Sequence, residues 1–420
     1  MERQQESVET VERSGLLSRG FSFFLGTQFL GAFNDNAFKF LLIGYAMSRL
    51  SKEASETYIP LTASMFILPF LVFSGLAGYL SDRYSKRTVM IWTKVLELVV
   101  MVSGLVLLWF HAVYGLLAVL FLMGTQSTLF SPGKYGYPSE TLLPERLSAG
   151  NGLLQLFTFL AIIAGGGVGG ILAERCSAAP WQGALVCVAV AVVGLLTSFG
   201  MGRTAAGSAS ARLSLRPVKP HLSTLREVLS DSGLRFAVIG NTYFWLLATI
   251  CQTNIAILVK QDMGLGESYM GLLQAGLALG IGLGSVLSGY LSRGRVAYGF
   301  VVPGGVMVSA SLLYGGFGAS SLWSSLASFV ALGTAAGFYQ IPLTTCIQQR
   351  SPSERLGAVI GACNVLDCVS MLVGTGLHWL MLSVLKLSGG QVLLMMGGLT
   401  LVFTLLVLRR LRPADGCVQE

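Results

Sequence analysis

Charged residues are scarce in this chain of 420 residues, where Asp, Glu, Lys and Arg together make up 11%. An ordinary soluble domain carries roughly 25%. Hydrophobic residues make up 53%. With so few charges to cover so much apolar surface, the composition excludes an ordinary soluble protein and predicts an all-α membrane protein.

Histidine and cysteine are also rare. None of the three histidines, His111, His221 and His378, is followed by an acid five residues later. The HxxxxD site of a phospholipid acyltransferase is therefore missing, although a membrane-bound acyltransferase stays open as an alternative that acyl transfer by the purified chain would revive. The seven cysteines fall singly, without metal-ligand or disulfide spacing. We expect no metal and no other cofactor.

Long apolar runs are abundant, and about twelve can be counted at a helix length of roughly 20 residues. The first 19 residues are polar, so we expect no cleavable signal peptide. The runs, which predict twelve transmembrane helices, are 20–48, 58–81, 88–110, 112–131, 149–173, 180–202, 234–260, 267–292, 297–318, 320–345, 355–382 and 389–408.

The net charge is +8. The distribution of the basic residues indicates a membrane topology rather than a nucleic-acid site. If the N-terminus is cytoplasmic, most lysines and arginines fall in cytoplasmic segments. Only Arg49, Lys52, Arg175, Lys260 and Lys386 fall on the other side. This bias predicts that both termini are cytoplasmic. The basic segments can also hold the headgroups of anionic membrane lipids.

The sequence repeats itself after half its length. Gly78-Tyr79-Leu80-Ser81 recurs as Gly289-Tyr290-Leu291-Ser292, at an offset of 211 residues, and Glu145-Arg146-Leu147 recurs as Glu354-Arg355-Leu356, at an offset of 209. Repeats six helices apart have the same topology, which predicts two pseudo-symmetric six-helix bundles with a substrate site between them. The predicted units are a cytoplasmic segment 1–19, a bundle 20–202, a linker 203–233, a bundle 234–408 and a tail 409–420.

The polar stretch from Asn34 to Lys39 interrupts the first apolar run near its middle. Ionisable groups at that depth are costly and normally face a protein interior or a water-filled cavity. Asp35 and Lys39 are four residues apart and share a helix face with Gln28 and Gly31. We therefore predict a functional site here. A neutralised pair that only fixes helix packing is the alternative.

The loop from Gly75 to Arg87 resembles the cytoplasmic signature between the second and third helices of the major facilitator superfamily. In that signature, glycines allow close helix contact, and the acid and the bases form a latch that depends on conformation. The resemblance implies the major facilitator fold. The second copy, Arg293-Gly294-Arg295, lacks the acid, so an asymmetric latch is expected. The predicted gating residues are Gly78, Asp82, Arg83, Lys86 and Arg87.

A glycine-rich run from Ala161 to Gly170 in the fifth predicted helix keeps a second function open. The run resembles the glycine-rich motif of drug/proton antiporters, but Ala161 replaces its first glycine and Gly166 its proline. The alternative is therefore a proton-coupled drug or metabolite antiporter of the same superfamily. Resistance and efflux assays with and without a proton gradient would separate the two functions.

Several segments together resemble the bacterial lysophospholipid transporter family within that superfamily. In the first half these are Gln28–Asn36, Ser131–Gly136 and Asn151–Leu153. In the second half they are Arg235–Trp245, Pro342–Arg350 and Asn364–Asp367. The resemblance spans nearly the whole chain.

The resemblance implies transport, without enzymatic activity, of lysophosphatidylethanolamine and lysophosphatidylglycerol from the outer to the inner leaflet of the bacterial inner membrane, by alternating access. It also implies that a separate acyltransferase/acyl-carrier-protein synthetase restores the missing chain, because this sequence lacks the acyltransferase motif of fused relatives.

Asp35 would meet an ethanolamine ammonium, Lys39 a phosphate, and Asn34, Asn36 and Gln155 the glycerol oxygens. Gln252 stands where the family commonly has arginine, which puts headgroup contact there in doubt. Each polar residue taken singly is as readily a bond between helices. The residues predicted to bind substrate or a coupling ion are Gln28, Asn34, Asp35, Asn36, Lys39, Asn151, Gln155, Gln252, Asn254, Asn364 and Asp367.

Overall fold

The computed structural model describes residues 15–205, 207, 219–266, 268–292 and 297–408. Within these ranges the regular secondary structure is helical. The predicted tail 409–420, most of the predicted segment 1–19 and much of the linker 203–233 lie outside the described residues, as does the second-half loop Arg293-Gly294-Arg295.

Each predicted apolar run overlaps one long helix. These helices are α1 (Arg19–Arg49), α2 (Lys52–Arg83), α3 (Lys86–Trp109), α4 (Gly115–Thr141), α5 (Leu147–Arg175), α6 (Pro180–Phe199), α8 (Ser232–Ile257), α9 (Ser268–Leu291), α10 (Tyr298–Phe317), α11 (Leu322–Arg350), α12 (Leu356–Trp379) and α13 (Gly389–Val402). Short 3₁₀ turns, Pro144–Arg146 and Ser353–Arg355, precede α5 and α12. Wider π-helical turns, Leu258–Asp262, Leu380–Val384 and Phe403–Leu408, continue α8, α12 and α13.

Among the described residues, 11 helices are long and apolar enough to cross a membrane. The helix α1 is not among them, although it has 31 residues. Its polar stretch from Asn34 to Lys39 lowers the mean hydropathy of the segment. The expected twelfth span therefore stays a prediction.

The helix α4 is longer than predicted. The apolar run ends at Ser131, before Pro132, yet α4 continues through Pro132 and Pro138 to Thr141. Proline removes a helical hydrogen bond, but packed neighbouring helices can satisfy the freed backbone groups in a membrane protein. As a result, Lys134 lies on a helix rather than in a loop.

The predicted linker contains a helix that the sequence did not reveal, α7 (Lys219–Ser230). This segment has no long apolar run. Pro220 falls in its first turn, where proline is tolerated because the backbone N–H would have no helical partner there. Glu227 of α7 pairs with Arg355, just before α12, at 2.5 Å.

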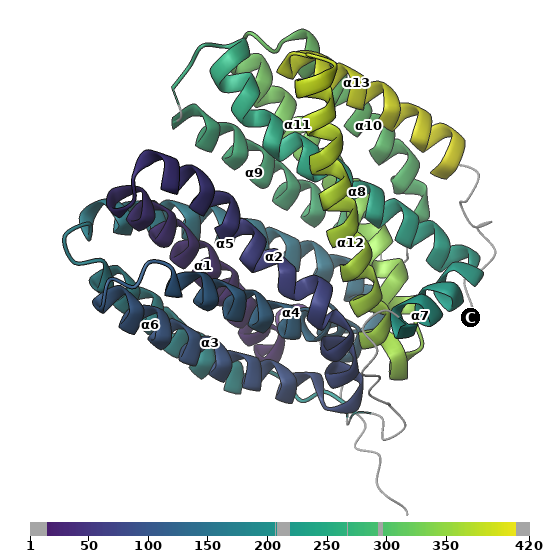
Figure 1. The fold of residues 1–420 in the computed structure, drawn as a ribbon. Helices are drawn as coiled ribbons and strands as arrows, with labels where there is room; N and C mark the ends of the chain where they lie inside the picture. Colours follow the sequence, from purple (N-terminus) through teal and green to yellow (C-terminus); the bar gives the residue numbers. More distant parts are fainter. Residues whose placement is uncertain (1–14, 206, 208–218, 267, 293–296, 409–420) are drawn as a thin grey trace, which may run out of the picture.

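The long helices form two groups, α1–α6 and α8–α13, which we call the N-terminal and C-terminal groups (Figure 1). Two hydrophobic clusters lie within the N-terminal group, one around Phe38 and one around Phe24. A third, around Phe329, belongs to the C-terminal group with one residue of α7. Each group therefore has its own buried core, and the two groups contact each other mainly through α5 with α9 and α2 with α12.

The two groups touch closely at one end, where the sequence repeat lies. A Cβ atom added at Gly78 of α2 would come within 2.7 Å of the carbonyl oxygen of Gly357 in α12. A Cβ atom at Gly289 of α9 would come equally close to the carbonyl oxygen of Ser148 in α5. These contacts are equivalent under the repeat, so we call this end of the molecule the closed end. The ribbons converge here and separate toward the opposite end (Figure 1).

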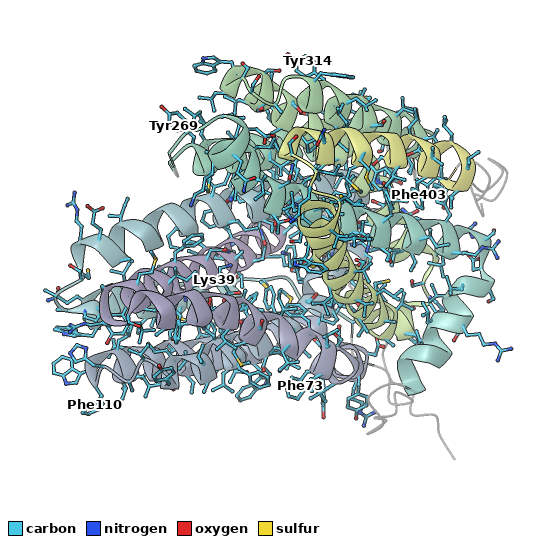
Figure 2. All side chains as sticks on the ribbon, turned by 45° about the horizontal axis from the view of Figure 1, so that its top comes forward. Lys39, Phe73, Phe110, Tyr269, Tyr314 and Phe403 are labelled. Carbon is cyan, nitrogen blue, oxygen red and sulfur yellow. The ribbon has the colours of Figure 1, made fainter. Side chains whose placement is uncertain are left out.

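Large apolar side chains cover much of the outside of both groups. Phe110 is 73% exposed and Tyr314 is 55% exposed, and both lie at the periphery (Figure 2). On a soluble protein so much exposed apolar surface would mark an interface. Here it suits contact with lipid.

Candidate functional site

A cavity of about 340 Å³ lies between the two groups of helices. Asp35 of α1 and Asp367 of α12 line it, so each group contributes one acid. Much of the remaining lining is apolar and includes Phe66 and Phe70 of α2 and Met371 of α12. We call this space the central cavity. It can hold a ligand that has both a polar group and an apolar part.

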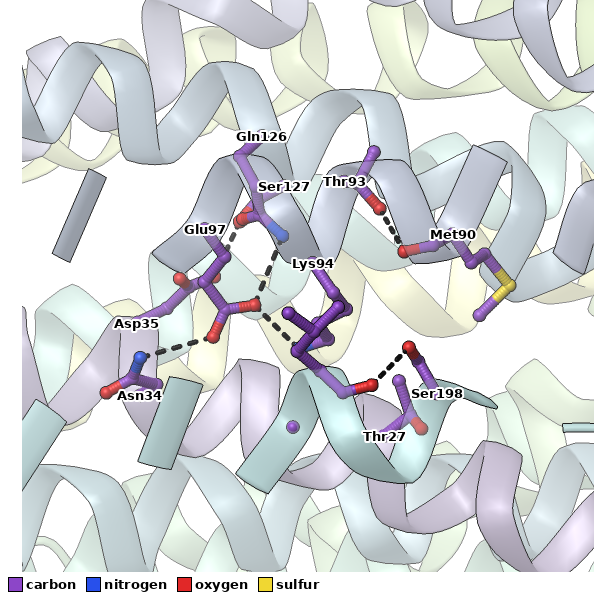
Figure 3. Close-up of polar contacts among 12 residues, drawn as sticks. Thr27, Asn34, Asp35, Met90, Thr93, Lys94, Glu97, Gln126, Ser127 and Ser198 are labelled. Atoms are coloured by element: carbon purple, nitrogen blue, oxygen red, sulfur yellow. Dashed lines mark hydrogen bonds and ion pairs between the residues drawn. The ribbon is translucent and has the colours of Figure 1, made fainter. Parts of the chain in front are cut away.

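Asp35 has one partner and one free oxygen. Ser127 Oγ of α4 donates to Asp35 Oδ2 at 2.5 Å (Figure 3). Asp35 Oδ1 is buried and has no hydrogen-bond partner within the described chain. A buried acceptor without a partner is costly. This oxygen is therefore available to a donor on a ligand.

Asp367 is held by a chain of amides in the C-terminal group. Asn241 Nδ2 of α8 donates to Asp367 Oδ1 at 2.7 Å, and Gln340 Nε2 of α11 donates to Asn241 Oδ1 at 2.5 Å. A pocket of about 70 Å³ adjoins the central cavity and shares Asp367, Asn364, Tyr135 and Trp245 with it. The two amide side chains hold Asp367 in place, and Asp367 lies where the pocket and the central cavity meet.

A lysine and an amide of the cavity lining are joined by a hydroxyl that is not itself part of the lining. Lys134 Nζ of α4 donates to Thr158 Oγ1 of α5 at 3.1 Å, and Thr158 Oγ1 donates to Gln28 Oε1 of α1, also at 3.1 Å. Lys134 and Gln28 line the cavity. The cavity lining therefore contains two carboxylates and two ammonium groups, since Lys94, which is paired with Glu97, also belongs to it.

Comparison with known families decides to which one these helices and this cavity belong. The model of the Major Facilitator Superfamily matches residues 24–375. The chain belongs to the Major Facilitator Superfamily. It is therefore a multi-pass membrane protein of a transporter family, and not an enzyme by family.

Curated relatives of this facilitator carry a more specific name. The "Lysophospholipid transporter LplT" of Photorhabdus laumondii is 25% identical over 376 residues, which cover 88% of this chain and 90% of the relative. The protein of the same name from Klebsiella pneumoniae is 27% identical over 390 residues, with 90% and 92% covered. The resemblance predicted from the sequence motifs is thus confirmed over nearly the whole chain.

Solved structures of other facilitators share the fold. The fucose:proton symporter FucP of E. coli, in an outward conformation, superimposes with a TM-score of 0.73 at 14% identity and covers 94% of this chain and 98% of its own. The human organic anion transporter MFSD10 gives a TM-score of 0.71 at 17% identity and covers 92% and 99%. At these identities the likeness shows the fold alone.

Three predicted binding residues of α1 lie beside the cavity rather than in its lining. Asn34 points into the N-terminal group, where its Nδ2 donates to Glu97 Oε1 at 3.1 Å (Figure 3). Asn36 Nδ2 donates to the Ala32 carbonyl, and Lys39 Nζ donates to Asn36 Oδ1 at 3.2 Å. Successive helical residues turn by about 100°. Asn34 and Asn36 are therefore turned away from the face of Asp35, whereas Lys39, one helical turn further along, shares that face but is not part of the cavity lining.

Among the predicted residues of the later helices, three line these spaces. Asn364 and Asp367 line both, and Gln155 lines the smaller pocket. Asn254 is buried and donates to the Gly389 carbonyl at 2.9 Å. Gln252 is exposed. Neither Gln252 nor Asn254 lines the cavity or the pocket, and their contact with substrate stays a prediction.

Asn151 joins the two groups of helices through amide hydrogen bonds. Its Nδ2 donates to Gln348 Oε1 of α11 at 2.6 Å, and Gln348 Nε2 donates back to Asn151 Oδ1 at 3.1 Å. Asn151 Nδ2 also lies 3.0 Å from Thr345 Oγ1. The structure therefore gives Asn151 a sealing contact near the closed end.

The predicted gating loop lies at the closed end. Asp82 Oδ1 accepts from the Gly357 N–H at 2.6 Å, and Asp82 Oδ2 accepts from the Ala358 N–H at 2.8 Å. These N–H groups begin α12, where a helix has unpaired donors and a partial positive charge. The acid of one group therefore caps a helix of the other.

Two bases of the gating loop, Lys86 and Arg87, form bonds within the N-terminal group. Lys86 pairs with Glu140 of α4. Arg87 Nε donates to the Met201 carbonyl at 3.0 Å, and Arg87 Nη2 donates to the Phe199 carbonyl at 2.8 Å. Asp82, in contrast, bonds to the C-terminal group.

Sequence reasoning missed Lys134, Asn241 and Trp245 as cavity residues. Lys134 belongs to the family segment Ser131–Gly136, but it falls just past the predicted apolar run 112–131 and so outside the predicted helix. Asn241 and Trp245 lie one helical turn apart on α8, and this four-residue spacing is a signal that could have placed both on one face.

Proposed function

We propose that this facilitator moves lysophospholipids, and that it does so by alternating access. One observation carries the proposal: a single cavity between the two groups of helices combines an acid from each group with a largely apolar wall. A lysophospholipid has a polar headgroup that needs buried partners and one acyl chain that needs an apolar surface. The curated relatives named for this substrate support the same conclusion.

The two acids suit a cationic headgroup. Asp35 Oδ1 has no partner in the described chain, and an ethanolamine ammonium would supply three donors. Phe66, Phe70 and Met371 would contact the acyl chain. The expected substrates are lysophosphatidylethanolamine and lysophosphatidylglycerol.

The closed end supports a direction of transport. If the basic loops are cytoplasmic, as their charge predicts, the closed end faces the cytoplasm and the structure is in an outward-facing state. The likeness to an outward-facing symporter agrees with this state. We propose movement from the outer to the inner leaflet of the bacterial inner membrane, where a separate acyltransferase/acyl-carrier-protein synthetase would reacylate the product.

The test is uptake of labelled lysophosphatidylethanolamine by proteoliposomes that contain the full chain. We expect Asp35→Asn and Asp367→Asn each to lower uptake to about one tenth or less, because each removes a hydrogen bond to a charged group. Glu174→Gln is the matched control, since Glu174 is an exposed acid near the end of α5.

Two results would contradict the proposal. One is undiminished uptake by both cavity variants. The other is the absence of lysophospholipid uptake by the parent together with export of organic cations that depends on a proton gradient, which would favour an antiporter.

A further inference from the structure

The cluster of Lys134, Thr158 and Gln28 at the central cavity has hydrogen-bond donors without an acceptor in the described chain. An ammonium group has three donors, and one of those on Lys134 goes to Thr158. Within the described chain no carboxylate forms an ion pair with Lys134. The side chain lines the central cavity, with its Nζ 5.4 Å from the centre of the Tyr135 ring.

Other lysines of the N-terminal group have different surroundings. Lys94 is paired with Glu97 at 2.6 Å, and Lys86 with Glu140. Lys39 donates to Asn36, and its Nζ lies 5.6 Å from the centre of the Phe66 ring. Lys39 does not line the central cavity as the described residues define it. Lys134 is therefore a cation that faces the cavity without a paired acid.

Gln28 adds a second unused donor to the same cluster. The residue is 1% exposed, and its Oε1 accepts from Thr158. The single Thr158 hydroxyl hydrogen also lies within reach of the Leu154 carbonyl, at 2.7 Å, and Gln28 Nε2 has no partner in the described chain. A buried N–H without an acceptor is costly. An acceptor supplied by a ligand in the cavity would remove this cost.

We propose that Lys134, Gln28 and Thr158 form a phosphate subsite of the central cavity. Lys134 binds the anion as a point charge, Gln28 Nε2 donates a hydrogen bond to it, and the Thr158 hydroxyl holds both side chains in place. The inference rests on the proposed function, because the phosphate is that of the lysophospholipid. It replaces Lys39 as the partner of the phosphate.

The subsite gives the cavity two poles of opposite charge. Lysine binds phosphate as a compact charge, and Asp35 and Asp367 bind the cationic group. A zwitterionic headgroup would then lie in one orientation, with its phosphate toward α1, α4 and α5. Free phosphate offers the same chemistry as a lipid headgroup, so the experiment includes both.

The experiment measures competition and binding with two single-chain compounds that share a dodecyl tail, dodecyl phosphate and dodecylamine. Each competes with labelled lysophosphatidylethanolamine in proteoliposomes, and each is titrated against the purified full chain by thermal shift. Inorganic phosphate forms the third arm. We expect Lys134→Met to weaken the binding of dodecyl phosphate by about tenfold or more, because the substitution removes a charged hydrogen bond. The binding of dodecylamine should change by less than about twofold.

Matched variants separate the subsite from general damage. Gln28→Leu and Thr158→Val should each weaken the binding of dodecyl phosphate by about threefold to tenfold. Lys386→Met removes an exposed lysine outside the cavity lining and should leave both competitors unchanged. Inorganic phosphate that competes as well as dodecyl phosphate, and loses affinity equally in Lys134→Met, would assign the subsite to a free anion and overturn its assignment to a lipid headgroup.

Two further outcomes would overturn the inference. One is Lys134→Met binding dodecyl phosphate as tightly as the parent chain. The other is an equal loss of both competitors, which would mean a distorted cavity. Because thermal shift does not require transport, a selective loss of dodecyl phosphate in a chain that moves no lysophosphatidylethanolamine would uphold the subsite while refuting the proposed function.

Discussion

At the scale of single residues, the pair Lys94 and Glu97 shows how the N-terminal group holds charge beside the cavity. Both side chains are 1% exposed, and their charged atoms are 2.6 Å apart. Gly31 makes room for the pair, because a Cβ atom there would come within 2.5 Å of Lys94 Nζ. Asn34 and Gln126 donate to Glu97 (Figure 3). The network fixes α1 in the rotation that turns Asp35 toward the cavity.

Replacing one member of this pair should destabilise the fold more than replacing both. Glu97→Met leaves the Lys94 charge buried without a partner, so we expect a loss of about 3–5 kcal/mol in the free energy of unfolding. Lys94→Met/Glu97→Met should lose much less than the sum of the single variants. Urea unfolding in detergent measures both. Additive losses would show that the two charges do not depend on each other.

At the scale of helices, the start of α12 is the element that links the two groups. Its first N–H groups donate to Asp82 of the other group, and Glu227 of α7 pairs with Arg355 just before it. The start of α8 is capped differently, by Asp231 of its own group. Burial opposes ionisation of Asp231, but the Leu234 N–H and Arg350 hold the pKa of this carboxyl below its ordinary value.

Removing the cap of α12 should open the closed end. A capping acid contributes about 1 kcal/mol, which corresponds to about a fivefold change in a two-state equilibrium. We therefore expect Asp82→Ala to increase the fraction of molecules open at this end. The measurement is the distance between spin labels at Tyr84→Cys and Glu354→Cys, on opposite sides of the contact.

The control for this prediction is Asp231→Ala, which removes a cap within one group. It should lower stability without changing the distribution of label distances. If both variants changed that distribution equally, the cap on α12 would have no special part in closing this end.

At the scale of the whole molecule, two equivalent contacts hold the groups together at the closed end. Gly78 meets Gly357, and Gly289 meets Ser148, each with backbone against backbone. Only glycine permits so close an approach. The amide pair of Asn151 and Gln348 adds hydrogen bonds across the same interface.

A single methyl group should therefore separate the halves. In Gly78→Ala the new Cβ atom would lie 2.7 Å from a backbone oxygen, which the contact cannot absorb without moving. We expect longer distances between the same spin labels and slower transport. Gly170→Ala is the control, because no atom lies within 4 Å of a Cβ atom at that position. Unchanged distances in Gly78→Ala would show that the contact is not tight in the membrane.

Several residues of this site could be predicted from the sequence. The interruption of an apolar run singled out Asp35, and family motifs singled out Asp367; both line the cavity. Lys134 was missed because the apolar run ends at residue 131, whereas α4 continues to Thr141. Asn34 was grouped with Asp35 because the two are adjacent, but a turn of about 100° per residue sends them to different surroundings.

The sequence by itself determined that the chain forms long apolar helices and that its two halves repeat, because hydrophobic runs and local motifs need no partner to be recognised. Only the tertiary structure decided which face of each helix meets the cavity. In a membrane helix most faces are apolar, so the pattern along the sequence orients the helix weakly. Packing against neighbouring helices fixes that rotation, and with it the separation of Asp35, which lines the cavity, from Asn34, which bonds to Glu97.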